Sequence, residues 1–413
     1  MQNTFENNQY RRAKVVQIVI VGAGPTGVTL ALLLTQRGIA VTLIEAAKDF
    51  HRVFRGEGLM PSGLDALEQM GLSPLLEHIP HRQLDAWEFI VGDKQLFRVE
   101  EPMGATRPCT LVSQPPLLKA LISEAQTNDG FEFIQGVPVK DLRWSNQRVA
   151  GVVLSDGREL TADLVIGADG RNSLVRQRIG LELVRQPKNI DILWFKLAAS
   201  PEFAADNVFR TIVNGDRVFT IFHGAESGKL HLAWVMSATE NTDFKQANWA
   251  ETFASLSPSW LAEHFRNHAD TIESPIRLSV VVGYCPQWHA PGVLLLGDAA
   301  HPMSPVRAQG INLALRDVIV AANHLVPLLH KEAEHKDIDM ALSHIQAERE
   351  PEIIRAQQLQ LQEAKQGELL RKNALLRSLL SQLAPLLRKI IKKSWLKRQY
   401  KMRQGITQVH LTV

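Results

Sequence analysis

Val15-Val16-Gln17-Ile18-Val19-Ile20-Val21-Gly22-Ala23-Gly24-Pro25-Thr26-Gly27 joins an apolar run of strand length to a glycine-rich turn. The following residues, Val28 to Arg37, repeat apolar side chains at helical spacing. In such a unit Gly22 permits the tight turn, Gly24 lets backbone N–H groups approach phosphate oxygens, and Gly27 lets the helix pack on the strand. Because the helix N-terminus adds partial positive charge, the stretch predicts a pyrophosphate-binding turn of a dinucleotide site.

A second predicted strand, Ile39 to Ile44, ends in Glu45. A carboxylate at this place after the glycine turn can accept hydrogen bonds from both ribose hydroxyls of an adenosine. The same charge would repel a 2'-phosphate. This site therefore favours FAD or NAD over NADP.

A second acidic turn follows another apolar run, far beyond the first motif in the chain. It reads Leu294-Leu295-Leu296-Gly297-Asp298-Ala299-Ala300-His301-Pro302. Asp298 can cap the next helix, since aspartate is favoured at that position, and this role is compatible with ligand binding. Two such turns, distant from each other in sequence, predict a long cofactor held at both ends, which is most simply FAD.

Composition sets the outer limits of the interpretation. The chain has 413 residues, of which 45% are hydrophobic and 22% charged, which is enough for two domains or one large composite domain. Cys109 and Cys285 show no metal-binding or CxxC spacing, so we expect free thiols, a reducing compartment and no metal site. No apolar run reaches about 18 residues, and residues 1–14 are polar, which predicts a cytoplasmic protein.

The C-terminal tail carries most of the positive charge. From Lys365 to Arg403 there are 12 Lys and Arg residues against one acid, Glu368, so a chain of net charge +3 has an otherwise acidic body of −8. Apolar residues recur there at helical spacing: Leu376, Leu379, Leu380, Leu383, Leu387, Ile390 and Ile391. The tail could lie on an anionic membrane, or pack on the body with a solvated basic face. Nucleic acid is not an expected partner, because the acidic body would repel phosphates.

The order of the predicted elements indicates an α/β fold without internal repeats. We expect a discontinuous FAD-binding domain of Rossmann type, similar to glutathione reductase, over residues 14–75, 100–182 and 285–360. Longer β-like runs, such as 191–198 and 229–236, predict an inserted and mostly β substrate-binding domain over 76–99 and 183–284. Residues 361–413 would form a basic amphipathic helical tail.

Three separated motifs carry a resemblance to a known family. They are 22–27, then Asp163-Leu164-Val165-Ile166-Gly167-Ala168-Asp169-Gly170-Arg171-Asn172-Ser173, then 297–302 continuing to Gly310-Ile311-Asn312-Leu313-Ala314. In order and spacing the chain resembles the single-component (group A) FAD-dependent monooxygenases, the aromatic hydroxylases typified by para-hydroxybenzoate hydroxylase. The resemblance covers about residues 14–330.

The resemblance implies a role for each matching residue. The pyrophosphate would be held by Gly22, Ala23, Gly24 and Gly27, with Arg55 nearby, and the ribose would be held by Glu45. The ribityl chain would be held by Gly297 and Asp298, and the flavin end by Gly310, Ile311 and Asn312. Gln114 would also contact FAD. Asp169 is similar to a residue linked both to FAD and to transient docking of NAD(P)H. A tight turn chosen for its backbone geometry explains Asp169-Gly170 equally well.

The implied reaction is hydride transfer from NADPH or NADH to FAD, formation of a flavin C4a-hydroperoxide with O2, and transfer of one oxygen atom to an aromatic or other apolar small molecule. The cofactor carries the difficult chemistry, so no catalytic acid or base is assigned. The protein must supply a dry pocket, expected between residues 302–310 and the inserted sheet. Pocket candidates are Pro305, Arg307 and His223, with Trp194, Phe209, Phe219, Phe222 and Trp234 as lining residues that could equally form the sheet core.

Arg307 departs from the family pattern, because many members have glycine in this loop. Its guanidinium could stabilise a flavin anion, bind an acidic substrate or point to solvent. Two other functions fit the same fingerprints: an FAD-dependent isoprenoid-type reductase, and a non-catalytic FAD-fold escort protein.

Overall fold

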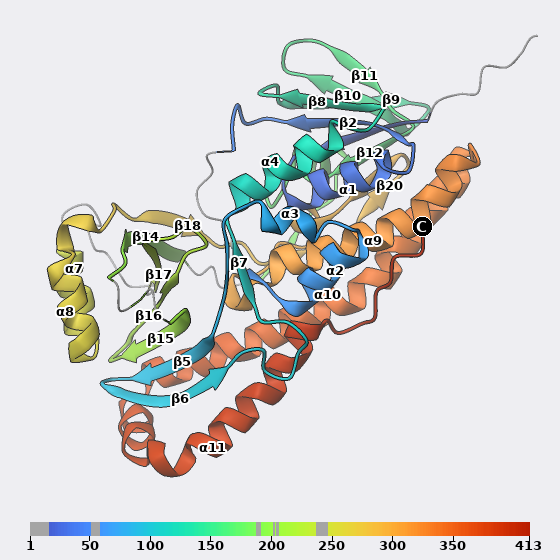
Figure 1. Ribbon diagram of the computed structural model, residues 1–413. Helices are drawn as coiled ribbons and strands as arrows, with labels where there is room; N and C mark the ends of the chain where they lie inside the picture. Colours follow the sequence, from blue (N-terminus) through green and yellow to red (C-terminus); the bar gives the residue numbers. More distant parts are fainter. Residues whose placement is uncertain (1–15, 51–57, 187–190, 201–202, 204–205, 237–246) are drawn as a thin grey trace, which may run out of the picture.

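The computed structural model describes residues 16–50, 58–186, 191–200, 203, 206–236 and 247–413. It is an α/β structure in which one sheet forms the upper part of the molecule, a second sheet lies at the lower left, and long C-terminal helices run from the lower left towards the right (Figure 1). The predicted fold class, an FAD-binding domain with a substrate domain and a helical C-terminal region, is confirmed.

The first sheet has the order β20-β21-β12-β1-β2-β8. Its strands are β1 (Gln17–Val21), β2 (Ala40–Glu45), β8 (Phe131–Gln135), β12 (Leu164–Gly167), β20 (His289–Ala290) and β21 (Val293–Leu295). All neighbouring pairs are parallel except β20 with β21. Because parallel strands end at the same edge, the turns that follow β2, β1, β12 and β21 lie side by side, and such an edge is where α/β sheets bind ligands.

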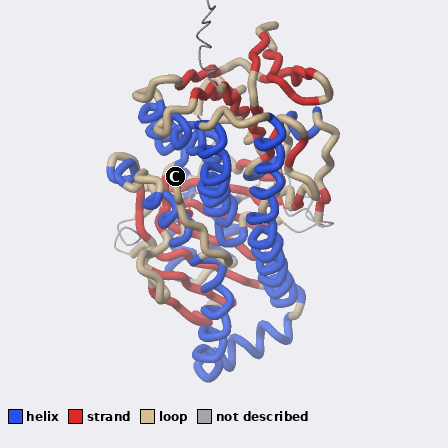
Figure 2. The backbone as a smooth tube through the Cα atoms, turned by 90° about the vertical axis from the view of Figure 1, so that its right-hand side faces the viewer, coloured by secondary structure: helices blue, strands red, loops and turns tan. Residues whose placement is uncertain are grey.

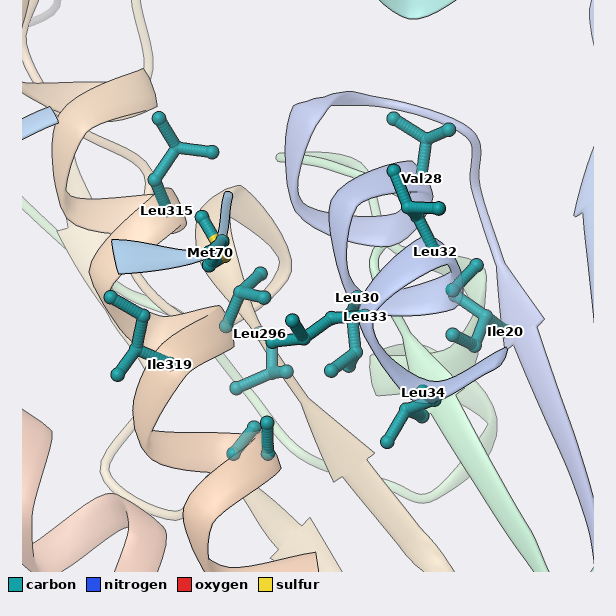
Figure 3. Packing of buried hydrophobic residues seen from close by; sticks show 14 of the residues in the cluster. Ile20, Val28, Leu30, Leu32, Leu33, Leu34, Met70, Leu296, Leu315 and Ile319 are labelled. Atoms are coloured by element: carbon teal, nitrogen blue, oxygen red, sulfur yellow. The ribbon is translucent and has the colours of Figure 1, made fainter. Parts of the chain in front are cut away.

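Two apolar helices pack together against this sheet, namely α1 (Pro25–Thr35) and α9 (Gln309–His330). Every residue of α1 after Pro25 is buried, as expected for a helix that is apolar all round. Figure 3 shows Leu30 and Leu33 of α1 beside Leu296, with Leu315 and Ile319 of α9 in the same cluster. This core fixes the N-termini of both helices relative to the sheet edge.

Smaller elements complete this region. The helices are α2 (Pro61–Gln69), α3 (Pro74–Glu77), α4 (Gln114–Ala125), α5 (Leu174–Arg178) and the 3-10 turns η2 (Gly297–Ala299) and η3 (Val306–Ala308). The minor sheets are β3 (Gly58–Leu59), β7 (Thr110–Val112) and β4 (His81–Gln83); β9 (Val139–Ser145), β10 (Arg148–Leu154) and β11 (Glu159–Thr161); and β13 (Val184–Arg185) with β19 (Gly283–Tyr284). Within the described residues, Val306–His330 is long and apolar enough to cross a bilayer, but 72% of its apolar window is buried, as in a core helix.

The second sheet has seven strands in the order β18-β14-β17-β16-β15-β5-β6. They are β5 (Ala86–Val91), β6 (Lys94–Glu100), β14 (Asp191–Ala198), β15 (Val208–Asn214), β16 (Arg217–His223), β17 (Lys229–Val235) and β18 (Ile276–Ser279). Helices α7 (Trp249–Ser255) and α8 (Ser259–Asn267) cover one face, and η1 (Ala269–Thr271) follows them. Two distant parts of the chain therefore build one sheet, while the domain limits given above stay a prediction.

The C-terminal region consists of two long helices that form a hairpin, α10 (His335–Lys372) and α11 (Ala374–Gln404) (Figures 1 and 2). The tail limit predicted at residue 361 falls inside α10, which runs through this point without interruption. The second half of α11 packs on β5 and β6 and buries Trp395, Gln399 and Met402. After Gln404 the chain has no helix and returns to the first sheet region, where the Arg37 guanidinium donates to the Val413 carbonyl at 2.5 Å.

Candidate active site

Three turns at the edge of the first sheet interlock through glycines. Gly22 has a φ of +103°, and a Cβ atom there would lie 2.5 Å from the carbonyl oxygen of Ala168, after β12. Gly297 has a φ of +59°, and a Cβ atom there would overlap the hydroxyl of Thr26 in α1. These positions require glycine both for conformation and for space. The motifs of residues 22–27, 163–173 and 297–302 therefore meet in one place.

The N-termini of α1 and α9 at this sheet edge are open to bind an anion. A Cβ atom on Gly24 would meet nothing within 4 Å, so open space lies in front of α1. Neither α1 nor α9 has a side-chain hydrogen bond at its N-cap residue. The first N–H groups of a helix lack partners within the helix, and together with the helix dipole they favour phosphate or another electron-rich group.

Asp298 lies at the N-terminus of α9. A Cβ atom on Gly310 would be 3.9 Å from Asp298 Oδ1, its nearest neighbour within 4 Å. The Asp298 side chain is exposed although Gly297 and Ala299 on either side are buried. The turn thus presents one carboxylate at the surface of an otherwise buried segment, next to the positive end of the helix.

Glu45 ends β2 and is held beside the glycine turn. Its Oε2 accepts the Ala23 N–H at 2.9 Å and its Oε1 accepts the Ala47 N–H at 2.9 Å. The side chain is buried, so these two bonds fix the carboxylate.

Asp169 caps α5 and keeps one oxygen free of protein donors. Its Oδ2 accepts the N–H groups of Leu174 at 2.7 Å and Val175 at 3.1 Å. Its Oδ1 is buried and has no hydrogen-bond partner among the described residues. Burial raises the pKa of Asp169, against the opposing effect of Ser173 and the two backbone donors. The turn role is therefore present, and an oxygen remains for a ligand.

The Asn312 side chain joins two segments at the start of α9. The Asn312 amide accepts the Met60 N–H at 2.8 Å and donates to the carbonyls of Gly58 at 3.0 Å and Ala308 at 2.5 Å. These bonds tie β3 to the start of α9. Gly310 and Ile311 lie in the first turn of α9, and Gln114 is the first residue of α4. Arg55 lies outside the described residues.

Arg307 is turned away from this edge and is enclosed by other side chains. Its backbone is left-handed, with φ 60° and ψ 26°. Ala308 after it is left-handed as well, with φ 49° and ψ 39°. The Arg307 guanidinium donates through Nε and Nη2 to Glu363 Oε1, with 2.8 Å for the Nε bond. It also lies over three aromatic rings, at 5.1 Å from the centroid of Trp87, 5.4 Å from Phe89 and 4.9 Å from Trp395. We call Arg307, Glu363 and these three aromatic residues the Arg307 cage.

The cage shows where the Arg307 guanidinium points, which the sequence left open. The Arg307 side chain is 9% exposed, so it does not point to solvent, and its charge is already paired with Glu363. Burial would raise the pKa of Glu363, but Arg307 and the Gln399 amide hold it below its ordinary value. The partners lie on β5, α10 and α11, and no local pattern in the sequence indicates them.

An aromatic row crosses one face of the second sheet. Side chains on this face pack in one core cluster with Met60, Cys109 and Leu111. The members of the row come from five adjacent strands: Trp194, His231, Phe222, Phe209 and Trp87. Successive ring centroids lie 5.4, 5.7, 4.8 and 4.6 Å apart. The row ends at the Arg307 cage, and it includes His231, which sequence reasoning missed.

Two of the expected lining residues lie on the opposite face of this sheet. Phe219 and Trp234 pack with Phe253 under α7 and α8, because neighbours along a strand point to opposite sides. They are core residues and do not line the site. Burial and nearby Lys196 and Lys229 lower the pKa of His231 to about 3, so its imidazole is neutral.

The other two pocket candidates differ in exposure. His223 is 2% exposed, and neither ring nitrogen has a hydrogen-bond partner among the residues that the structure describes. Burial and the charge of Arg82 lower its pKa to about 4. Pro305 is exposed at the start of the turn that leads into α9. His223 is therefore a buried neutral group, and strand alternation places it on the face of Phe219 and Leu230 and outside the aromatic row.

A buried ion network, also missed from sequence, links the Asp298 turn to the C-terminus. His301 Nε2 lies 2.8 Å from Asp317 Oδ2, and Arg349 Nε donates to Asp317 Oδ1 at 2.8 Å. Arg349 also pairs with Glu352, which accepts from Arg316 Nε at 3.0 Å and from the Ile406 N–H at 2.7 Å. Burial would raise the pKa of Asp317, but His301 and Arg349 keep it below its ordinary value.

The chain belongs to the FAD binding domain family, whose model matches residues 15–353. It is 29% identical over 362 residues to 6-methylpretetramide 4-monooxygenase of Streptomyces rimosus, covering 84% of this chain and 83% of that protein. It is 26% identical to 3-demethoxyubiquinol 3-hydroxylase of Escherichia coli, with 75% and 79% covered.

Solved structures agree on the fold. Pseudomonas aeruginosa PqsL in complex with 2-aminobenzoylacetate superposes with a TM-score of 0.73 at 22% identity, covering 89% of this chain and 99% of that one. p-Nitrophenol 4-monooxygenase PnpA of Pseudomonas putida gives 0.74 at 17% identity, with 95% and 99% covered. The predicted group A resemblance is confirmed: the protein is an FAD-dependent monooxygenase. Among the described residues no cluster of three or more metal-binding side chains occurs.

Proposed function

We propose that the protein hydroxylates a planar aromatic small molecule, with NADPH or NADH as the reductant and O2 as the source of the oxygen atom. The aromatic row beside the start of α9 carries this proposal, because it offers stacked and edge-on faces to a flat ring. The similar proteins above are named for action on 6-methylpretetramide and 3-demethoxyubiquinol, and PqsL binds 2-aminobenzoylacetate.

The residues at the sheet edge fit FAD from one end to the other. The N–H groups at the start of α1, next to the open space at Gly24, would hold the pyrophosphate, and Glu45 would accept from the adenosine ribose. Asp298 would accept from the ribityl hydroxyls, and the first turn of α9 would face the flavin ring. When bound, FAD accepts a hydride from NAD(P)H and, with O2, supplies the oxygen atom.

The protein's own contribution is placement and the exclusion of water. Trp194, Phe222 and Phe209 are apolar and would shield the reacting centre from solvent. His231 lies in the aromatic row and is neutral, so its imidazole can share a hydrogen bond with a phenol or amine without introducing charge. Asp169 Oδ1 is the proposed contact for FAD or for passing NAD(P)H.

The cofactor site is tested by FAD retention. Asp298→Ala removes the carboxylate at α9, and Gly24→Leu fills the space in front of α1. We expect both purified variants to lose most bound flavin, measured by flavin absorbance and by titration with FAD. Asp337→Ala is the matched control, because Asp337 is also an exposed acid in the first turn of a helix. Full FAD content in both site variants would contradict the assignment.

The reaction is tested with the intact FAD-loaded protein. Candidate aromatic metabolites are screened for those that accelerate NADPH or NADH oxidation, with O2 uptake, H2O2 and hydroxylated product measured in parallel. A true substrate shifts the outcome from H2O2 to product. Oxidation of NAD(P)H without O2 uptake would contradict a monooxygenase reaction in this chain, while leaving the FAD site intact.

A further inference from the structure

Helix α11 has apolar side chains on two different sides. On one side, Trp395 and Met402 are buried against the rest of the protein, with Leu380 and Ile391 half-buried in the same cluster. On the other side lie Leu375, Leu379, Leu386 and Ile390, which are 84%, 52%, 76% and 68% exposed. The second set is not explained by packing within the chain. We call it the exposed leucine stripe.

The stripe consists of two pairs of neighbouring side chains. Leu375 and Leu379, and then Leu386 and Ile390, are each four positions apart, and at 3.6 residues per turn such a pair lies on one side of a helix. Pro385 lies between the two pairs, and α11 bends along its length (Figure 2). The end of α10 adds Leu369, which is 58% exposed. Singly exposed leucines are common, but a group of them near the end of one hairpin marks an interaction surface.

Basic residues without acidic partners flank the stripe. Helix α11 contains nine Lys and Arg residues and no Asp or Glu. Arg377, Arg398 and Arg403 bond to groups within the protein. The other six form no ion pair with any described residue: Arg388, Lys389, Lys392, Lys393, Lys397 and Lys401. All of them except the half-buried Lys392 are exposed.

We propose that this face of the α10–α11 hairpin docks on an anionic lipid surface. The stripe would enter the boundary between head groups and acyl chains, and the lysines and arginines would meet the lipid phosphates and carboxylates. A second copy of the chain is a poorer occupant, because pairing two such faces would bring the six unpaired cations of one copy against the same six of the other.

The position of the hairpin fits this use. It lies at the lower edge of the molecule, beyond the second sheet and away from the edge of the first sheet that carries the glycine turns (Figure 1). Docking there leaves the cofactor site uncovered. The inference concerns a surface outside the catalytic site and does not rest on the proposed reaction.

The test is co-sedimentation of the full-length FAD-loaded protein with vesicles. One set is phosphatidylcholine alone, and the other is equal parts of phosphatidylcholine and phosphatidylserine. We expect pelleting with the second set, weakened by salt. The triple variant Lys389→Gln, Lys393→Gln, Lys397→Gln should lower the partition coefficient about a hundredfold, at about fivefold for each basic residue. The variant Leu379→Gln, Leu386→Gln, Ile390→Gln should lower it at least tenfold.

Matched controls distinguish binding through this surface from an effect of net charge or of exposed apolar area in general. Lys119→Gln, Lys140→Gln, Lys331→Gln removes the same charge from exposed sites outside the hairpin, and Trp144→Gln removes an exposed apolar side chain there. Both should bind vesicles as the unaltered protein does. Absence of pelleting with the anionic vesicles, or equal loss in the body variants, would overturn the proposal. So would a stripe variant that turns a dimer into a monomer in sedimentation velocity.

Discussion

Removal of the Arg307 charge should destabilise the protein by far more than a surface substitution. In Arg307→Met the long apolar stem is retained and thioether–ring contacts replace some of the lost contacts with Trp87, Phe89 and Trp395. The Glu363 carboxylate, whose side chain is 15% exposed, loses its cation and keeps only Gln399 as a neutral side-chain donor. Breaking a buried ion pair on one side costs about 3–5 kcal/mol.

The assay is a double-mutant cycle read by urea unfolding. Arg307→Met and Glu363→Gln are compared singly and together, because the double variant carries no unpaired charge in the cage. If the pair acts as the geometry indicates, the double variant should recover about 2 kcal/mol relative to the sum of the single losses. Two losses that simply add, or a single loss below about 1 kcal/mol, would refute the cage as a stabilising unit.

The pH dependence gives the same test a second reading. The folded pKa of Glu363 lies below the ordinary 4.5, so its ionised form stabilises the folded protein above that pH. The contribution disappears as the pH falls through the lowered folded value. In Arg307→Met the pKa of Glu363 is no longer lowered by the guanidinium. The fall in the free energy of unfolding at acidic pH that belongs to this ion pair should therefore disappear.

Three further results are expected from the same reasoning. Gly297→Ala should release FAD and lower the thermal midpoint, because the new Cβ overlaps a hydroxyl of α1, whereas Gly157→Ala, with φ +90° and open space, should cost only the roughly 1–2 kcal/mol of a left-handed residue. The pKa of His231 is about 3 in the folded protein and about 6.5 in the unfolded chain, so the unaltered protein loses about 2 kcal/mol of folding free energy between pH 6.5 and about pH 5, as the unfolded state takes up the proton. In His231→Phe the free energy of unfolding should lose this dependence on pH. Phe222→Ala should raise the KM for an aromatic substrate and the share of H2O2, while Phe219→Ala, on the opposite face, should lower stability without changing KM; equal KM values for the two would contradict the placement of the aromatic row.

The sheet edge could be predicted from the sequence because its signals are local. A glycine turn, a strand ending in Glu45 and an acidic turn after an apolar strand each report on a few neighbouring residues. The doubly wound strand order then brings strand ends that are distant in sequence to one edge. What remained open for Asp169 was whether it serves a tight turn or binds a ligand, since both uses place the same side chain after the same strand.

The second sheet was harder to interpret, since its strands carry apolar residues on both faces. From Leu230 to Val235 all residues but His231 are apolar, so alternation does not show which side meets the first domain. Phe219 and Phe222 could not be separated for the same reason. The tail boundary expected at residue 361 lies within α10, since a change in charge does not end a helix, and Pro351 is accommodated within the same helix.

The tail does more than carry the exposed leucine stripe, and this determines how the stripe can be tested. Trp395 forms one wall of the Arg307 cage, the buried Arg403 pairs with Glu101, and the Ile406 N–H donates to Glu352 in the network that reaches His301. Deleting α11 and the residues after it would leave buried Glu352 and Glu101 without these partners, each at a cost of the order of 1–3 kcal/mol or more. A truncated chain that fails to bind vesicles would therefore report unfolding as readily as lost lipid contact. Because the four stripe side chains are all more than half exposed, point substitutions there leave the buried partners in place and isolate the surface.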